Sequence, residues 1–339
     1  MGHSAAVWDF RAATELTKDW NGIDQVVLRT PQGASARVSL HGAQVTSWRN
    51  EHGEELLFTS SKTVSSKAPK AIRGGIPICF PQFGNCGSLE RHGFARNRMW
   101  SIDENPPPLP PNDSRGKSFV DLLLKSSEED VRYWPHSFEF RLRVCLTTNG
   151  DLTLISRIRN INGKPFSFSF AYHTYLLVSD ISEIRIEGLE TLDYLDNLSQ
   201  KERFTEQGDA ITFESEVDRL YLSSPNIIAV LDHERKRTFI IRKEGLPDVG
   251  KLSIVCCSMV ISLILVTPLF LVCAAVWNPW EKKSKSMVDL GDEEYKHMLC
   301  VDGAVIEKPV NLKPGEEWTG RIQLSVVGSS FCSDRLGFR

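Results

Sequence analysis

The segment Ser137–Leu146 reads SFEFRLRVCL, with apolar and polar side chains alternating along its length. The alternation places four apolar side chains on one face, which is the pattern of a half-buried β-strand: Phe138, Phe140, Leu142 and Val144. After Asn149-Gly150, a favoured pair for a tight hairpin turn, Leu152–Ile158 (LTLISRI) continues with strand-forming residues. The two runs predict an antiparallel hairpin, and this hairpin indicates the fold class.

Further β-rich runs lie on both sides of this hairpin. They cover residues 25–29, 36–40, 166–170, 227–231, 237–242 and 318–324. No long amphipathic helix pattern accompanies them, and the proline-rich stretch Asn105–Pro111 reads as a loop because similar strands lie before and after it. We therefore expect an all-β protein, a large antiparallel β-sandwich in which residues 1–339 form a single domain with a core of about residues 15–335.

The composition excludes several classes of protein. The 339-residue chain carries 40 Lys and Arg against 43 Asp and Glu, a net charge of −3, whereas general nucleic-acid binding requires a basic surplus. Its eight cysteines form no CxxC pair and no cluster with histidines, so we expect reduced thiols and neither a zinc site nor a disulfide framework. The first residues include Asp9, Arg11 and Glu15 and lack the apolar core of a secretion signal, which favours a cytoplasmic location.

Arginines and glycines gather in one short stretch of the chain. Residues 73–96 contain Arg73, Arg91, His92 and Arg96 together with five glycines and two prolines. Gly and Pro fix irregular backbone, where binding groups often lie, and arginine side chains suit a phosphate dianion. A turn-rich loop with solvated arginines is the alternative, because no Walker-type phosphate motif is present.

A histidine between tyrosines follows one of the aromatic strands. His173, in Ala171–Tyr175 (AYHTY), has a side chain that can exchange a proton near neutral pH, although a structural histidine fits the same pattern. Asp218, Asp302 and Glu307 are candidate acids in a chain with many carboxylates. One of them becomes a candidate catalytic residue only if its carboxylate contacts the His173 imidazole.

Four motifs, taken in their order, resemble those of the glucose-6-phosphate 1-epimerases, a branch of the aldose 1-epimerase (galactose mutarotase) superfamily, and the plant-type members above all. The motifs are residues 73–83 (RGGIPICFPQF), 92–96 (HGFAR), 171–181 (AYHTYLLVSDI) and 276–280 (VWNPW). The resemblance implies a large antiparallel β-sandwich. It also implies the interconversion of α- and β-anomers of a hexose 6-phosphate, an isomerase reaction that uses neither a metal nor a redox cofactor.

The implied reaction needs one acid and one base. The acid protonates the ring oxygen of the sugar, the base removes the proton of the C1 hydroxyl, and the opened ring closes on its other face. The resemblance makes His173 the acid and Asp302 the base, where relatives carry the Glu of a Cys-Val-Glu motif. Since the aspartate side chain is one methylene shorter, Glu307 is the alternative base, and a turn residue before Gly303 is the alternative role of Asp302.

The same motifs imply the substrate contacts. Arg73 and Arg96 correspond to residues that bind the substrate, and we expect them to contact its phosphate. Arg91 stands where relatives commonly have Gln, His92 lies beside it, and Asp218 corresponds to an acid that binds sugar hydroxyls. The expected partner is a small sugar phosphate, with the choice of hexose and the oligomeric state left open. A catalytically impaired sugar-phosphate-binding or regulatory homologue is the alternative function.

An uncharged run interrupts the resemblance. Leu252–Trp280 contains 29 residues without a charged side chain, and about 20 apolar residues can span a bilayer. A spanning helix here would separate Asp302 from His173 by a membrane, so that one sandwich could not form. In relatives, the position of Asp248 is followed almost directly by the VWNPW motif. We therefore expect an apolar insertion at about 250–275, encoded by a retained intron, with a membrane segment or a functional loop as alternatives.

Overall fold

Strands dominate the computed structural model, which describes residues 13–62, 71–108, 118–245 and 273–328. The strands form three antiparallel sheets, one of four strands and two of eight. Two short α-helices and several 3₁₀ turns complete the described part: α1 (Glu128–Tyr133), α2 (Trp280–Ser286), η2 (Ala95–Asn97), η3 (Ile181–Glu183), η4 (Asn197–Ser199) and η5 (Glu294–His297).

The first eight-stranded sheet carries His173 and the acids that sequence analysis singles out. Its strands follow the order β14-β13-β15-β18-β19-β10-β5, and β11 pairs with β19 beside this path. The bounds are Ile78–Cys79 for β5, Phe166–Tyr172 for β10, Tyr175–Leu177 for β11, Asp193–Asp196 for β13, Glu202–Thr205 for β14, Val217–Tyr221 for β15, Cys273–Asn278 for β18 and Met298–Leu312 for β19.

The second eight-stranded sheet contains the predicted hairpin. Its order is β12-β16-β17-β20-β9-β8-β7-β6. The bounds are Ser101–Ile102 for β6, Ser118–Lys125 for β7, Phe138–Leu146 for β8, Leu152–Asn160 for β9, Ile184–Glu187 for β12, Ile227–Asp232 for β16, Arg237–Glu244 for β17 and Glu317–Gly328 for β20. Strands β8 and β9 pair from Phe138 opposite Asn160 to Leu146 opposite Leu152, and Gly150 in their turn adopts φ 84°, a region that favours glycine.

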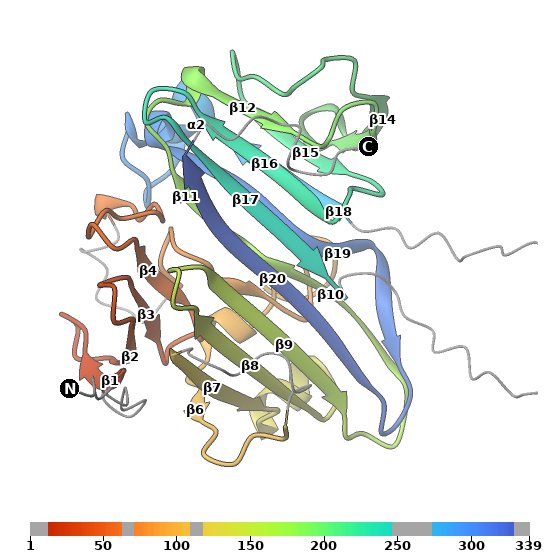
Figure 1. Ribbon diagram of the computed structural model, residues 1–339. Coiled ribbons are helices and arrows are strands. Elements are labelled where there is room, and N and C mark those ends of the chain that lie inside the picture. Colours follow the sequence, from red (N-terminus) through yellow and green to blue (C-terminus); the bar gives the residue numbers. More distant parts are fainter. Residues whose placement is uncertain (1–12, 63–70, 109–117, 246–272, 329–339) are drawn as a thin grey trace, which may run out of the picture.

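The four-stranded sheet comes from the start of the chain and has the order β1-β2-β3-β4. Its strands are Thr14–Lys18, Asp24–Arg29, Ser35–Ser39 and Val45–Arg49. It lies against β7 and β8, and Figure 1 shows it beside the end of the second sheet where these two strands run.

The two large sheets pack face to face, and the core lies between them. Aromatic rings cross this interface: Phe170 of the first sheet lies 6.0 Å from Phe140 of the second, and Phe168 lies 5.6 Å from Trp318. The Tyr172 hydroxyl donates a hydrogen bond across the same interface to the Ser156 hydroxyl at 2.8 Å. All these rings are at most 4% exposed, and each such burial contributes roughly 1.5–3 kcal/mol to folding.

The expected antiparallel β-sandwich is therefore confirmed. Each β-rich run predicted from the sequence coincides with a strand in the described chain, and the longer α-helix has only seven residues. The end of the uncharged run, Cys273–Asn278, is strand β18 between β15 and β19. The remainder up to residue 272 lies outside the described residues. Among the described residues, no helix is both long enough and apolar enough to cross a membrane.

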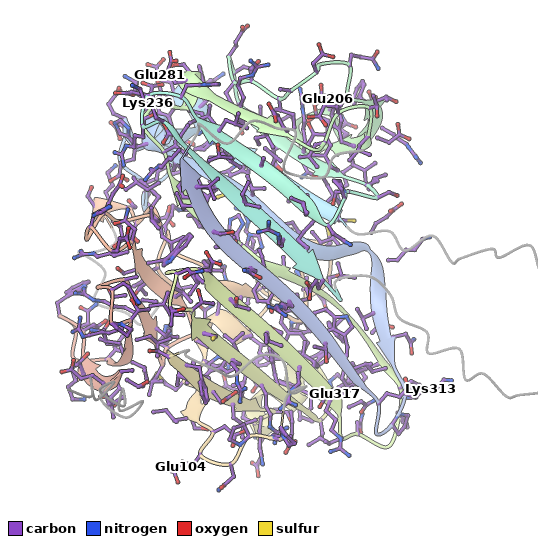
Figure 2. All side chains as sticks on the ribbon, in the orientation of Figure 1. Glu104, Glu206, Lys236, Glu281, Lys313 and Glu317 are labelled. Carbon is purple, nitrogen blue, oxygen red and sulfur yellow. The ribbon has the colours of Figure 1, made fainter. Side chains whose placement is uncertain are left out.

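One lysine departs from the usual placement of charge. Figure 2 shows charged side chains such as Glu104, Lys313 and Glu317 at the rim of the molecule, where they are exposed. Lys243 of β17 is instead only 1% exposed, and its ammonium group donates to the Ser224 hydroxyl at 2.5 Å. Burial removes the charged form from water and lowers the pKa of Lys243 to about 7.

Candidate active site

The candidate site lies on the face of the first sheet that points away from the sandwich core. Along β19, Val301 and Val305 belong to the main core, so Cys300 and Asp302 occupy the opposite face. Strand pairing extends this face sideways, because residues opposite one another on neighbouring strands share a face. It aligns Asp218, Trp277, Cys300 and Tyr175 in one row across β15, β18, β19 and β11. We call this surface the site face.

His173 and Asp302 form a direct hydrogen-bonded pair on the site face. The Nδ1 atom of His173 lies 2.7 Å from Oδ2 of Asp302, and the other carboxylate oxygen accepts a hydrogen bond from the Thr174 amide at 2.9 Å. Asp302 is 1% exposed and His173 is 8% exposed. The carboxylate therefore lies behind the imidazole, fixes its orientation and has both of its oxygens engaged.

The neighbouring carboxylates are placed differently. Glu307, the alternative base, is exposed further along β19 and makes no contact with His173 that would replace Asp302. The interpretation of Asp302 as a turn residue is wrong, because it lies within β19, opposite Ala275 of β18. The acid and the base that the resemblance implies, His173 and Asp302, are thus hydrogen-bonded to one another in the structure.

His92 stacks on the catalytic candidate. Its ring lies 5.4 Å from that of His173, centroid to centroid, at an interplanar angle of 23°. The side chain is 7% exposed, and burial, followed by the charges of His173 and the three arginines of residues 73–96, lowers the pKa of His92 to about 2. His92 is therefore a neutral imidazole at physiological pH.

Gly93 allows the motif HGFAR to fold back onto the preceding loop. Its φ of +72° lies in the left-handed region, and a Cβ atom there would stand 2.2 Å from the Phe80 carbonyl oxygen. The close approach brings residues 91–96 against residues 78–84, so that His92 reaches the site face from a loop and Arg96 from the short turn η2, rather than from a strand.

Arg73 is held in a definite position at the edge of the site face. One guanidinium nitrogen donates to the Tyr175 hydroxyl at 3.2 Å, and another forms an ion pair with Asp289 at 2.8 Å. The guanidinium also lies over the Trp277 ring, 5.8 Å from its centroid. Its Nε atom is buried without a hydrogen-bond partner among the described residues.

Arg96 and Arg91 are connected to one another. Arg96 donates to the Arg91 carbonyl oxygen at 2.8 Å, and its own Nε is likewise buried without a partner in the described chain. No ion pair with a carboxylate is found for Arg96 within the described residues, whereas Arg73 has Asp289. Arg91 is exposed. Of the two half-buried arginines, Arg73 and Arg96, Arg96 is therefore the one whose charge is less neutralised.

Asp218 completes the row of polar groups. It is partly buried, and burial raises its pKa, while a 2.7 Å hydrogen bond from Asn197 and the nearby charges of Arg91 and His173 oppose the rise. The structure thus gathers His173, Asp302, Arg73, His92 and Asp218 near one another on the site face, with the arginines of the loop beside them.

Sequence analysis missed several members of this site. Tyr175 and Trp277 lie within the quoted motifs AYHTY and VWNPW, and the motif signal could have found them. Asn197 and Asp289 reach the site only through the tertiary fold, by contacts with Asp218 and Arg73.

The described chain has a groove away from the site face, and the placement of its described His, Cys, Asp and Glu residues bears on the presence of a metal site. A groove of about 890 Å³ lies over the four-stranded sheet, and none of the site residues lines it. Nowhere in residues 13–62, 71–108, 118–245 and 273–328 do three His, Cys, Asp or Glu side chains gather as the ligands of a metal ion would. The chemistry available on the site face is that of imidazole, carboxylate and guanidinium groups.

Comparison with known proteins gives a consistent assignment. A protein of Cenchrus ciliaris, provisionally named glucose-6-phosphate 1-epimerase, is 61% identical over 324 residues, which cover 95% of this chain and 90% of that protein. A Salmonella typhimurium protein with the same provisional name is 28% identical over 290 residues, 85% of each chain.

Solved structures share the fold. A provisionally named mutarotase from Salmonella typhimurium superposes with a TM-score of 0.74 at 24% identity, over 94% of this chain and 98% of that one. A galactose mutarotase-like protein from Clostridium acetobutylicum gives 0.67 at 16% identity, over 93% and 98%. The family model of aldose 1-epimerase matches residues 24–249 and 271–325 and so leaves out 250–270, most of which belongs to the uncharged run. The resemblance seen in the sequence is confirmed, and the chain belongs to the aldose 1-epimerase family.

Proposed function

We propose that the chain interconverts the α- and β-anomers of a hexose 6-phosphate by opening and closing the sugar ring. The observation that carries the proposal is the hydrogen-bonded pair of His173 and Asp302 on a face bordered by three arginines. The 61% identity to a relative provisionally named glucose-6-phosphate 1-epimerase supports glucose 6-phosphate as the substrate. No feature of the described chain favours the silent sugar-phosphate-binding alternative.

His173 exchanges the proton with the sugar in this proposal. Because Asp302 accepts a hydrogen bond from Nδ1–H, the Nε2 atom of His173 carries a lone pair that can take the proton of the C1 hydroxyl. The imidazolium that forms then delivers this proton to the ring oxygen, and the C1–O5 bond breaks to leave an aldehyde. Rotation about C1–C2 and the reverse steps give the other anomer, with no net gain or loss of protons.

Asp302 acts through His173. Sequence analysis assigns the removal of the anomeric proton to this carboxylate itself, and that assignment stays a prediction. Its 1% exposure and its two hydrogen bonds favour a different division of the work, in which Asp302 orients the imidazole and stabilises its charged form. The acid and base roles then alternate on one imidazole.

The arginines would hold the phosphate. Arg96 offers a guanidinium that no carboxylate neutralises in the described chain, Arg73 lies at the edge of the site face, and exposed Arg91 is in contact with Arg96. Guanidinium forks match phosphate oxygens in geometry and charge. Asp218, fixed by Asn197, would accept hydrogen bonds from sugar hydroxyls. An anchored phosphate keeps the opened chain in place while C1 rotates, which favours closure over release.

An anomer-specific assay tests this function. α-Glucose 6-phosphate is generated from α-glucose by hexokinase, and a β-specific glucose-6-phosphate dehydrogenase reports formation of the β-anomer. We expect the chain to accelerate β-anomer formation above the buffer rate, and to accelerate it far less for glucose, for which polarimetry serves. Binding of glucose 6-phosphate without acceleration would contradict the proposal.

We also infer a single domain in a reducing, cytoplasmic compartment. Strands β17 and β18 on the two sides of the apolar insertion both belong to the sandwich, which supports one interrupted domain. The cysteines at 79, 86, 273 and 300 are free thiols in the described chain, which supports a reducing environment. Cell fractionation with thiol labelling tests the compartment; recovery of the chain in a secreted fraction would contradict it.

A further inference from the structure

We propose that Asp289 is a positioning residue that acts through Arg73: its carboxylate occupies the place of the substrate's phosphate when no ligand is bound and leaves when the phosphate arrives. The inference rests on the proposed function and deepens it, because it names the group that sets how strongly the site holds a phosphosugar. It starts from the ion pair at the edge of the site face, in which the Arg73 guanidinium and the Asp289 carboxylate lie 2.8 Å apart.

Arg73 lies close to the group that exchanges protons with the sugar. Tyr175 connects the two, because its ring lies 4.6 Å from the His173 ring, centroid to centroid, and its hydroxyl accepts a hydrogen bond from Arg73 at 3.2 Å. The guanidinium is thus one side chain away from the imidazole. A hexose phosphate that presents its anomeric carbon to His173 can therefore present its phosphate to Arg73.

An anchored loop brings the Asp289 carboxylate to this position. Asp289 lies in residues 287–293, between α2 and η5. The next residue, Leu290, is fully buried in the same small apolar cluster as Tyr175, the hydrogen-bond partner of Arg73. The loop therefore packs against the site face directly beside the carboxylate.

Glu294 also ties this loop to the part of the chain that carries Arg73. Its carboxylate accepts hydrogen bonds from the Gly291 amide and from the Ser60 hydroxyl, both at 2.6 Å. The Ser60 amide in turn donates to the Arg73 carbonyl oxygen at 2.9 Å. Because both backbones are fixed to Ser60, the pairing of Asp289 with Arg73 is set by the fold and is more than a chance contact of two surface side chains.

The two partners differ in how much water reaches them. The Arg73 side chain is 19% exposed, whereas that of Asp289 is 48% exposed. A carboxylate that is half in water completes its hydration when it rotates away from the guanidinium. An ion pair open to water contributes little, roughly fivefold or less in an equilibrium constant, so Asp289 can be displaced at small cost. The more buried guanidinium stays in place and keeps its need for an anion.

A phosphate dianion is the ligand that this exchange suits. It repels the Asp289 carboxylate, so the two anions do not share the Arg73 guanidinium. It also has three acceptor oxygens and can contact Arg96 at the same time, because both guanidinium groups act on His92 at the site face. Asp289 therefore weakens phosphate binding, keeps Arg73 oriented between turnovers and favours release of the product when it pairs with Arg73 again.

Calorimetric titration of the full chain with inorganic phosphate tests the direction of the effect. We expect Asp289→Asn to lower the Kd of phosphate about three- to tenfold, because the competing carboxylate is gone. Asp292→Asn is the matched control, since Asp292 lies on the same loop but pairs with Lys62 at 3.2 Å, and its Kd should equal that of wild type. Weaker or equal binding in Asp289→Asn, an equal gain in Asp292→Asn, or no phosphate binding by any form would overturn the proposal.

A double-variant cycle shows whether Asp289 acts through Arg73. In Arg73→Ala there is no guanidinium for the carboxylate to occupy, so adding Asp289→Asn should leave the Kd of phosphate unchanged. A gain as large as that seen with Arg73 present would mean that Asp289 repels phosphate directly, and it would overturn the positioning role.

Carbon NMR on the wild-type chain follows the exchange itself. With ¹³C at the aspartate carboxyl groups, the Asp289 signal is identified by its loss in Asp289→Asn. We expect this signal to shift as inorganic phosphate is added and the Asp292 signal to stay in place. An Asp289 signal that is unchanged at saturating phosphate would show that the carboxylate does not leave, and it would overturn the proposal.

The epimerase assay gives the kinetic counterpart. In Asp289→Asn the KM for glucose 6-phosphate should fall by the same factor as the Kd of phosphate, with kcat equal to or below that of wild type because the product leaves more slowly. The KM for glucose, which has no phosphate, should not change; an equal fall for both sugars would overturn the proposal. A wild-type chain that binds phosphate but has no epimerase activity would instead overturn the proposed function, while the phosphate titrations would still decide the role of Asp289.

Discussion

Replacement of Asp302 by asparagine should abolish most of the turnover while leaving the chain folded. Asp302 accepts from His173 Nδ1 with one oxygen and from the Thr174 amide with the other. Asparagine has only one oxygen, so its NH₂ group must face one of these two partners. If the oxygen keeps the Thr174 contact, the NH₂ group donates to Nδ1, and the His173 proton moves to Nε2, which can then no longer take a proton from the sugar.

The expected magnitude follows from this change of tautomer. An Asp→Asn change behind a catalytic histidine costs about 10⁴-fold in kcat in serine proteases, and we expect a loss on the order of 10³–10⁴-fold in Asp302→Asn. The KM should change little, because Asp302 is 1% exposed and does not reach the substrate in the proposed arrangement. The lost charge-assisted hydrogen bond should lower the free energy of unfolding by roughly 1.5–3 kcal/mol.

The assay couples anomer exchange with structural controls. The β-specific dehydrogenase assay gives kcat and KM, thermal unfolding shows that the variant is folded, and ¹⁵N NMR shows whether the His173 proton has moved from Nδ1 to Nε2. Glu307→Gln is the matched control, because Glu307 is an exposed acid on the same strand and should keep wild-type kcat. A folded Asp302→Asn chain that retains more than roughly a tenth of kcat, a loss below about 1.4 kcal/mol in activation free energy, would refute the reasoning.

Three further predictions concern charge and the apolar insertion. Arg96→Ala and Arg73→Ala should lower kcat/KM for glucose 6-phosphate roughly 10- to 100-fold and for glucose much less. Asp289→Asn, which frees the Arg73 guanidinium, should lower the KM for the phosphosugar. Equal losses for both sugars in the arginine variants would contradict a phosphate contact. The pKa of Lys243 is lowered to about 7 from 10.5, so the unfolded chain binds more protons between these values and the free energy of unfolding should rise with pH there, by up to about 1.4 kcal/mol per unit. Denaturant titrations of wild type and Lys243→Met check this, and a rise that persists in the variant would assign it to other groups. Deletion of residues 250–270, which the family model leaves out, should increase the soluble yield and keep the specific activity; equal yield of both forms would contradict the prediction.

The local sequence pattern was enough to predict the strands and the family. Alternation predicts β8, strand-forming residues predict β9 and β10, and the four quoted motifs predict the residues around His173. The direct pairing of His173 with Asp302 was not predictable in this way. The two residues are 129 positions apart and meet because β10 lies next to β19, and the order of strands in a sheet depends on the packing of the whole chain.

The contacts of the loop that carries His92 could not be predicted from the sequence either. The Nδ1 atom of His92 contacts the Gly84 amide and the Cys79 sulfur, and the backbone of residues 78–93 sets these contacts. Asp289 modifies Arg73 from a segment more than two hundred residues away. Sequence patterns show which residues can act as acids, bases or phosphate ligands, whereas these contacts determine the role of each residue.

Exchange NMR on glucose 6-phosphate labelled with ¹³C at C1 tests the central claim most directly. At anomeric equilibrium, saturation of the α-anomer signal should be transferred to the β-anomer signal much faster with the wild-type chain than in buffer, and at nearly the buffer rate with Asp302→Asn. A wild-type transfer rate equal to that of buffer, under conditions in which glucose 6-phosphate binds, would contradict the assignment of His173 and Asp302 as the pair that opens the ring.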